Sequence, residues 1–212
     1  MIKFYLFTDG GQFRKQKEPP VFDSVTSVRV LCRIDGGEPE LLHTEQVVNV
    51  DSTGNFSEVN AIRKSLGWVV KTLRDSELYT GDVEIELYTD SMLYHQSLTK
   101  WIYGWLKRAK AGYMYSSSKT PVANQEEIII AFKFMEWLRI RKNASVKFFH
   151  VNSHTAKKSF KFYKDKFEAF NKCKVSNDEF AFILLQNQYC DESVKTAYKQ
   201  YKLNLISKDT TK

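Results

Sequence analysis

The chain has 212 residues, of which 42% are hydrophobic and 14% aromatic. This is enough for one sizeable core, and no apolar run approaches the ~20 residues that span a bilayer, so we expect no membrane association. Lys and Arg number 32 against 25 Asp and Glu, and the formal net charge of +7 suits a polyanionic partner. The three cysteines are odd in number and match no metal spacing, which indicates reduced thiols in a cytoplasmic protein.

The first predicted strand covers the apolar run Ile2–Phe7 and leads to Asp9. Gly10 and Gly11 follow at once, and taken alone this pattern is more typical of a strand that ends in a turn than of a site. The functional alternative is a carboxylate held by a cation, with bare backbone that a ligand can approach.

Two further strands are predicted at residues 25–34 and 41–50, with a turn at 35–37 between them, so residues 2–50 should form an antiparallel meander. A helix is predicted from Ser57, because its apolar residues recur with the 3.6 period. Glu58 would stand in its first turn, either as a residue favoured by the helix dipole or as a metal ligand.

A fourth strand at residues 83–88 also ends in Thr-Asp, with Asp90 in the position that Asp9 has after the first strand. If the two strands are neighbours, their carboxylates meet at one sheet edge and repel each other unless cations hold them. A fifth strand at residues 146–151 is followed by His154, which would fall at the same edge, although a lone histidine there is more often structural.

Residues 100–120 combine bases and aromatic residues without any acid, which suits contact with a nucleic-acid backbone or, alternatively, an amphipathic helix that buries its tryptophans. A long helix should open at Asn124 with a variant capping box.

Residues 155–186 are basic and aromatic and hold a short apolar segment at 180–185 that could be a helix. We expect a last helix to open at Asn187, with Asp191 in its first turn. The polar tail 207–212 should be frayed, and residues 1–206 should form a single domain.

Five short motifs in this order resemble those of type 1 ribonuclease H. They are Phe7-Thr8-Asp9-Gly10-Gly11, Asn55-Phe56-Ser57-Glu58, Tyr88-Thr89-Asp90-Ser91, Val151-Asn152-Ser153-His154 and Asn187-Gln188-Tyr189-Cys190-Asp191-Glu192. Residues 101–108 look like the basic protrusion of the bacterial members. The resemblance covers most of the chain and implies an α/β fold: a mixed five-stranded sheet, three antiparallel strands and then parallel strands 4 and 5, flanked by helices.

The resemblance also implies a function: hydrolysis of the RNA strand of RNA–DNA hybrids to 5′-phosphate and 3′-hydroxyl products, by a monomer. Two Mg²⁺ ions, with Mn²⁺ as a possible substitute, would be held by metal ligands Asp9, Glu58, Asp90 and Asp191, which with His154 form the predicted catalytic set. The substrate-binding residues it implies are Gly10, Gly11 and Asn55 for the RNA strand, and Trp101, Trp105, Lys107, Arg108 and Lys110 for the DNA strand.

Three departures from the family pattern stand beside this resemblance. Met92 follows Asp90-Ser91 where many relatives have a glutamine, Gln12 replaces a small residue, and 37 positions separate His154 from Asp191. The rival hypotheses are another nuclease on the same fold, such as a junction resolvase or an exonuclease, and a non-catalytic hybrid-binding module.

Overall fold

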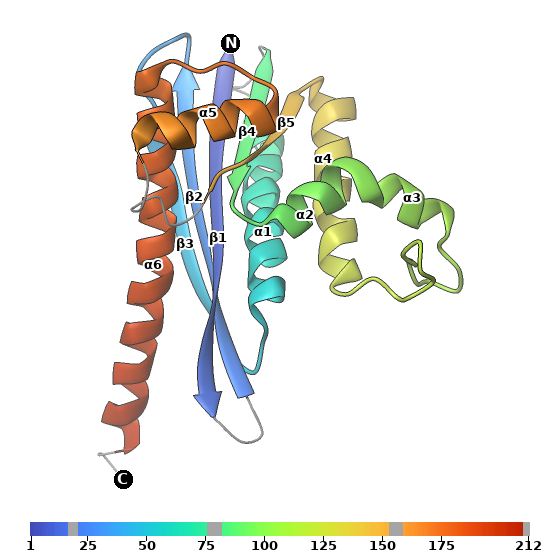
Figure 1. Ribbon diagram of the computed structural model, residues 1–212, viewed down its shortest axis with the longest axis vertical. Helices are drawn as coiled ribbons and strands as arrows, with labels where there is room; N and C mark the ends of the chain where they lie inside the picture. The colour runs from blue at the N-terminus through green and yellow to red at the C-terminus, as the bar shows by residue number, and fades with distance from the viewer. Residues whose placement is uncertain (17–20, 76–81, 153–158, 210–212) are drawn as a thin grey trace.

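The computed structural model describes residues 1–16, 21–75, 82–152 and 159–209. Its centre is a five-stranded sheet with the order β3-β2-β1-β4-β5 (Figure 1). The pairs β1–β2 and β2–β3 are antiparallel, and β1–β4 and β4–β5 are parallel. This confirms the predicted fold class. The strands are β1 Ile2–Gln16, β2 Val21–Ile34, β3 Glu40–Asn49, β4 Val83–Thr89 and β5 Ser145–His150.

Helices cover both faces of the sheet (Figure 1). Helices α1 (Gly54–Asp75) and α4 (Gln125–Lys142) pack on one face, and α5 (Phe160–Asn171) and α6 (Asn177–Asp209) pack on the other. After β4 the chain leaves the sheet through three short helical segments, α2 (Met92–Gln96), the π-helix η1 (Ser97–Trp101) and α3 (Ile102–Lys107). None of the helices within the described ranges is long and apolar enough to cross a membrane.

The strict alternation of strand β1 divides the core into two layers. Phe4 and Leu6 face α1 and α4, whereas Tyr5 and Phe7 face α5 and α6. All four side chains are at most 1% exposed. Burial of an apolar side chain of this size contributes about 1.5–3 kcal/mol, so both faces of this strand hold the sheet to its helices.

Strand β1 is longer than the sequence predicts. It runs through Gly10 and Gly11, which pair with Thr26 and Val25 of β2, so the expected turn at Asp9 is wrong. Two glycines in a row are tolerated inside this strand because helices from both faces approach the backbone there. The meander and the turn at 35–37 are confirmed.

The C-terminal helix also differs from the prediction. Residues 177–209 form one continuous helix, so the helix predicted to open at Asn187 is wrong, and Asp191 lies in its interior and not in a first turn. No glycine or proline interrupts this stretch, and Asn187 is simply an interior helical residue. The helix also includes residues 207–209 of the tail that we expected to be frayed.

The start of α4 lies where the sequence predicts, but the capping box does not form. Asn124 has left-handed backbone with φ of 52°, and no side chain caps the helix. Its side-chain amide instead donates to the Tyr94 hydroxyl at 2.8 Å, and the Gln125 side chain accepts from the Met114 amide at 2.8 Å. These polar residues therefore fasten the segment after β4 to the body of the protein.

Candidate metal centre

Three acidic residues from different elements meet beside the middle of the sheet. Asp9 lies on β1, Asp90 directly follows β4, and Glu58 lies on α1. The parallel register pairs Thr8 with Thr89, which places Asp9 and Asp90 side by side. One carboxylate oxygen from each residue can be chosen so that the three lie within 4.8 Å of one another. The structure thus brings together three of the four predicted metal ligands.

The two glycines after Asp9 allow this approach. A Cβ on Gly10 would stand 2.5 Å from both the Glu58 amide nitrogen and the Ser57 Oγ. A Cβ on Gly11 would stand 2.4 Å from Cγ1 of Val194 in α6. Successive residues of a strand face opposite sides of the sheet. The missing side chain of Gly10 therefore lets α1 pack closely on one face, and that of Gly11 lets α6 pack closely on the other. Any larger residue would push a helix away from the carboxylates.

Helix α1 begins earlier than expected, at Gly54, so Glu58 lies in its second turn and not in its first. Gln12 explains this start, because its Oε1 accepts the Gly54 amide at 2.8 Å and so satisfies one of the unpaired amides of the first turn. Gln12, which stands where the family pattern has a small residue, therefore stabilises the helix that carries Glu58.

Two of the three carboxylates, those of Asp9 and Glu58, are electrostatically strained. Burial, together with the charges of Asp90 and Asp191, raises the pKa of Asp9 to about 7, although the Gly10 amide donates to its Oδ1 at 2.7 Å. Burial, with Asp90 and Asp9 next, raises the pKa of Glu58 well above its usual range. The Oε2 atom of Glu58 is fully buried and has no hydrogen-bond partner in the described parts of the chain.

This donor set fits a divalent metal ion. Buried carboxylates that repel one another need a counter-charge, and no lysine or arginine forms an ion pair with Asp9 or Glu58 among the residues that the structure describes. Mg²⁺ takes hard oxygen ligands and keeps several waters, so a few carboxylates suffice to bind it. The orphaned Oε2 of Glu58 is a ready ligand for such an ion.

Asp191, the fourth predicted ligand, stands apart from this group. It lies on α6, close enough to contribute to the raised pKa of Asp9. Its own Oδ2 is 2.5 Å from Nζ of Lys195, one turn further along the helix. Asp191 therefore borders the cluster while its charge is partly satisfied within α6.

His154 lies outside the described residues, but another histidine, which the sequence motifs did not indicate, is at the site. His150 ends β5, pairs in register with Thr89, and its Nε2 is 3.1 Å from the Asp90 carbonyl oxygen. Asn171 of α5 holds its backbone, accepting from the His150 amide at 2.9 Å and donating to the His150 carbonyl at 3.0 Å. Burial lowers the pKa of His150 and so favours the neutral ring. The sequence offered one sign of this role: His150 is near the end of the predicted fifth strand, which was expected to end at the same sheet edge as Asp90.

The predicted substrate-binding residues lie around this cluster and on the segment after β4. Asn55 is exposed in the first turn of α1. In the protrusion, Trp101 is 39% exposed and Trp105 only 9%, with ring centroids 5.8 Å apart, so one tryptophan is buried and the other presents its face. Lys107, Arg108 and Lys110 are exposed. A cavity of about 390 Å³ is lined by residues Lys100, Trp101, Gly104, Trp105, Arg108, Ser116 and Ser117.

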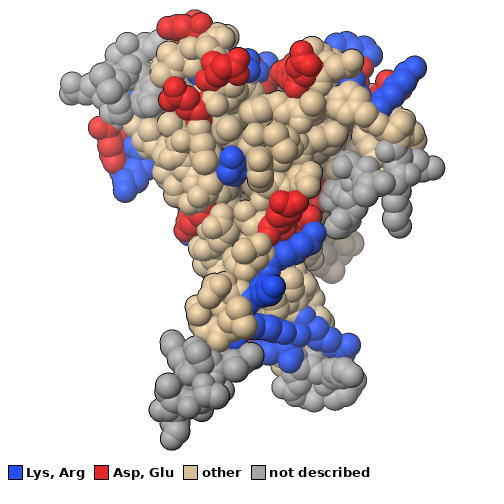
Figure 2. Space-filling model, turned by 90° about the vertical axis from the view of Figure 1, so that its left-hand side faces the viewer, with Lys and Arg blue, Asp and Glu red and all other residues tan. Residues whose placement is uncertain are grey.

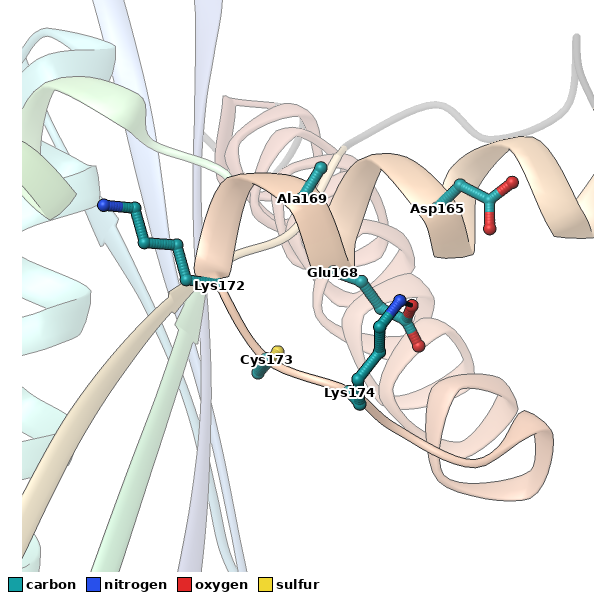
Figure 3. Close-up of a pocket in the computed structure, with 6 residues that line it drawn as sticks. All are labelled: Asp165, Glu168, Ala169, Lys172, Cys173 and Lys174. Carbon is teal, nitrogen blue, oxygen red and sulfur yellow. Dashed lines mark hydrogen bonds and ion pairs between the residues drawn. The ribbon is translucent and has the colours of Figure 1, made fainter.

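A larger hollow of about 570 Å³ lies at the C-terminal end of α5 (Figure 3). Within it the side chains of Glu168 and Lys174 point toward each other, and their Oε2 and Nζ atoms are 2.6 Å apart. Lys172 points away from this pair. Glu168 is thus paired with a lysine, which distinguishes it from Asp9 and Glu58 in the metal centre.

Comparison with known proteins places the chain in a family. The RNase H family matches residues 2–162, more than half of the chain, a range that includes Asp9, Glu58 and Asp90 and ends before Asp191. A protein named ribonuclease H from Erythrobacter litoralis (strain HTCC2594) is 32% identical over 93 residues, which are 44% of this chain and 47% of that protein. The match thus spans about half the length of this curated relative.

A solved structure shares the fold. The solution structure of the PFV RNase H domain covers 81% of this chain and 89% of its own, with a TM-score of 0.51 and 14% identity. The crystal structure of LC11-RNase H1 in complex with an RNA/DNA hybrid covers 80% and 99%, with a TM-score of 0.43 and 16% identity. The fold, the position of the carboxylates and the family match agree, and the chain belongs to the RNase H family.

Proposed function

We propose that this protein is a metal-dependent endoribonuclease that hydrolyses the RNA strand of RNA–DNA hybrids and acts as a monomer. The observation that carries the proposal is the group of Asp9, Glu58 and Asp90, whose carboxylate oxygens lie within 4.8 Å of one another. A structural acid would be paired with a cation or with several donors, whereas Asp9 and Glu58 repel each other and form no ion pair with a lysine or arginine among the described residues. Because the chain belongs to the RNase H family, we expect this arrangement to hydrolyse RNA.

Asp9, Glu58 and Asp90 would hold the metal, with Asp191 as a further ligand from α6. Two Mg²⁺ ions, or Mn²⁺ in their place, would supply activation of the attacking water and stabilisation of the departing alkoxide. The products would carry 5′-phosphate and 3′-hydroxyl ends.

The chain itself fixes the geometry of these ligands. The Gly10 amide orients the Asp9 carboxylate, and the close contact of α1 with Gly10 sets the position of Glu58. The His150 ring contacts the carbonyl of Asp90 and positions the loop that carries this ligand. His154 would assist proton transfer or product release from the loop after β5.

The hybrid would lie across the exposed side of this centre. The backbone at Gly10 and Gly11, with the exposed Asn55, would read 2′-hydroxyls of the RNA strand in the shallow minor groove. The cavity between Trp101, Trp105 and Arg108 supports the assignment of the protrusion to the DNA strand, with Lys107 and Lys110 as further phosphate contacts.

A substrate panel tests this function. Labelled RNA–DNA hybrid, double-stranded RNA, double-stranded DNA and a branched DNA junction are each incubated with Mg²⁺, with Mn²⁺ and with a chelator. We expect cleavage of the RNA strand of the hybrid with either metal and none with the chelator. Preferred cutting of the junction would favour a resolvase, and release of single nucleotides from ends an exonuclease. Binding of the hybrid without any turnover would favour a non-catalytic module.

A further inference from the structure

A row of lysines continues outward from the metal centre along α6. Asp191, Lys195 and Lys199 are spaced four residues apart, and Lys202 follows three residues later. At 3.6 residues per turn these positions lie on one side of the helix. The row extends about 16 Å from Asp191, roughly the rise of five base pairs.

The part of α6 that carries these lysines is held firmly in place. Val194 and Tyr198 are buried against Val25 of β2, and the Tyr198 ring stacks on Phe13 of β1 with centroids 4.0 Å apart. The extended ends of β1 and β2 and this half of α6 therefore form one rigid arm beyond the metal centre (Figure 1). The lysines stand beside the buried stripe and are exposed.

The charge on this arm is mostly positive. Figure 2, which views the α6 side, shows Lys and Arg gathered over the narrow lower part of the molecule and most of the acids above it. Of the acids on the arm, Asp23 and Asp51 both lie beside Lys15, at 3.9 Å and 3.2 Å. Within the described ranges Lys199 and Lys202 form no ion pair, although Nζ of Lys202 lies 5.0 Å from the centre of the Tyr198 ring.

A second basic helix provides a contrast. In α5, Lys164 pairs with Glu168 at 3.6 Å, and Lys174 just after the helix pairs with the same residue at 2.6 Å. The positive charges of Lys164 and Lys174 are offset by Glu168, whereas Lys199 and Lys202 are exposed and form no ion pair within the described ranges, on the helix that also carries Asp191. A polyanion that enters the site in this direction would meet these two lysines.

We propose that Lys199 and Lys202, the lysine row of α6, bind the phosphate backbone of the nucleic-acid duplex. The contact would lie beyond the metal centre, toward the C-terminal end of α6. The row extends the substrate interface by contacts that read charge and not sequence. This inference rests on the proposed function, because it takes the duplex that is cleaved as its ligand.

The test is the salt dependence of duplex binding. The full chain with Lys199→Ala and Lys202→Ala binds a fluorescent RNA–DNA hybrid in EDTA, so that no cleavage occurs, over a series of KCl concentrations. Removal of one lysine–phosphate interaction flattens the slope of log affinity against log salt by about 0.9, so we expect the double variant to have a slope flatter by up to about 1.8. Lys199→Arg with Lys202→Arg should keep the wild-type slope.

A matched control removes two exposed cations from the opposite face of the sheet. Lys133→Ala with Arg141→Ala on α4 makes the same change in net charge, and its slope should stay at the wild-type value. Thermal melting confirms that each variant folds. The proposal is overturned if the α6 pair changes the slope by less than about 0.45, if the α4 pair changes it equally, or if the wild type binds no duplex.

Failure of the proposed function is a separate result. If the wild type cleaves no hybrid in Mg²⁺ yet binds duplexes, the proposed activity fails while the slope still decides whether the lysine row contacts phosphates. If the hybrid is cleaved and the slope is unchanged, only the lysine row is wrong.

Discussion

Asp9 and Glu168 are buried to the same extent, each 8% exposed, yet their surroundings have opposite effects. Glu168 accepts from Lys174 at 2.6 Å and from the Val175 amide at 3.2 Å, and these donors lower its pKa. Asp9 accepts from the Gly10 amide and lies near the acids Glu58, Asp90 and Asp191, and burial, with the charges of Asp90 and Asp191, raises its pKa to about 7. A buried carboxylate thus stabilises the fold in one place and strains it in the other.

We interpret this difference as that between a structural acid, Glu168, and a proposed metal ligand, Asp9. Glu168 has its cation within the chain and is complete as it stands. Asp9 and Glu58 form no ion pair with a lysine or arginine among the described residues, and we propose that a metal ion supplies their counter-charge. The exposed fraction of the side chain would not distinguish the two, whereas the depth of Asp9 and the partners of each carboxylate do.

The largest expected effect on activity comes from Asp9→Asn. The amide has nearly the same shape but cannot hold a divalent ion as a carboxylate does, so cleavage of the hybrid should fall by at least about a thousandfold. Binding of the hybrid should survive, because the phosphate contacts are elsewhere. Single-turnover cleavage in Mg²⁺ measures the first and a titration in EDTA the second. Turnover near the wild-type rate would mean that Asp9 is not a metal ligand.

Gly10→Ala tests whether the close approach of α1 builds the cluster. Its Cβ would stand 2.5 Å from the Glu58 amide nitrogen, so α1 must shift and carry Glu58 away from Asp9. A displacement of about 1 Å can cost about a hundredfold in rate, and we expect a loss of that order together with a lower melting temperature. Ser65→Ala, a buried substitution two turns further along α1, controls for a generic loss of packing in this helix. Unchanged cleavage would show that the position of Glu58 is not critical.

His154→Ala should slow cleavage much less than Asp9→Asn, by under about a hundredfold, because the histidine is proposed to aid a proton transfer that the metals already promote. The pH–rate profile should change in its shape as well as its height. A loss as complete as that of Asp9→Asn would contradict this supporting role.

Glu168→Gln should have the smallest effect on activity. It should lower the stability of the protein, whereas Asp9→Asn should raise the stability of the metal-free protein. Loss of the pairing with Lys174 lowers the melting temperature near pH 7, whereas cleavage stays close to the wild-type rate. Because the folded state lowers the pKa of Glu168, its contribution is present above the unfolded value and is lost as the pH falls through the folded one. The destabilisation by Glu168→Gln should therefore disappear in acid. A large loss of cleavage at neutral pH would place Glu168 in the site.

The sheet and the three carboxylates were predictable because they depend on local patterns. Alternation marked the strands, and short motifs marked Asp9, Glu58 and Asp90. The predictions that failed concern features that depend on tertiary packing. The strand continues through Gly10 because helices pack against it from both faces, and α6 is continuous because nothing in the chain breaks it. His150 carried no motif, and its role follows only from the pairing of β5 with β4.

The central claim is that the carboxylates around Asp9 are strained until a divalent ion binds them. Since the folded state raises the pKa of Asp9, the metal-free protein should lose stability as the pH rises from about 4 towards about 7, by at most about 1.4 kcal/mol per pH unit. The buried His95 and His150, whose pKa values are lowered by burial, contribute with the opposite sign in the same range. The contribution of Asp9 must therefore be measured as a difference.

The most direct measurement is the free energy of unfolding from about pH 5 to about pH 8, with and without Mg²⁺, for the wild type and Asp9→Asn. We predict that in EDTA the variant becomes progressively more stable than the wild type as the pH rises. We also predict that Mg²⁺ stabilises the wild type at pH 8 and has little effect on the variant. Parallel curves in EDTA, with equal responses to Mg²⁺, would contradict the claim that these acids form a metal centre.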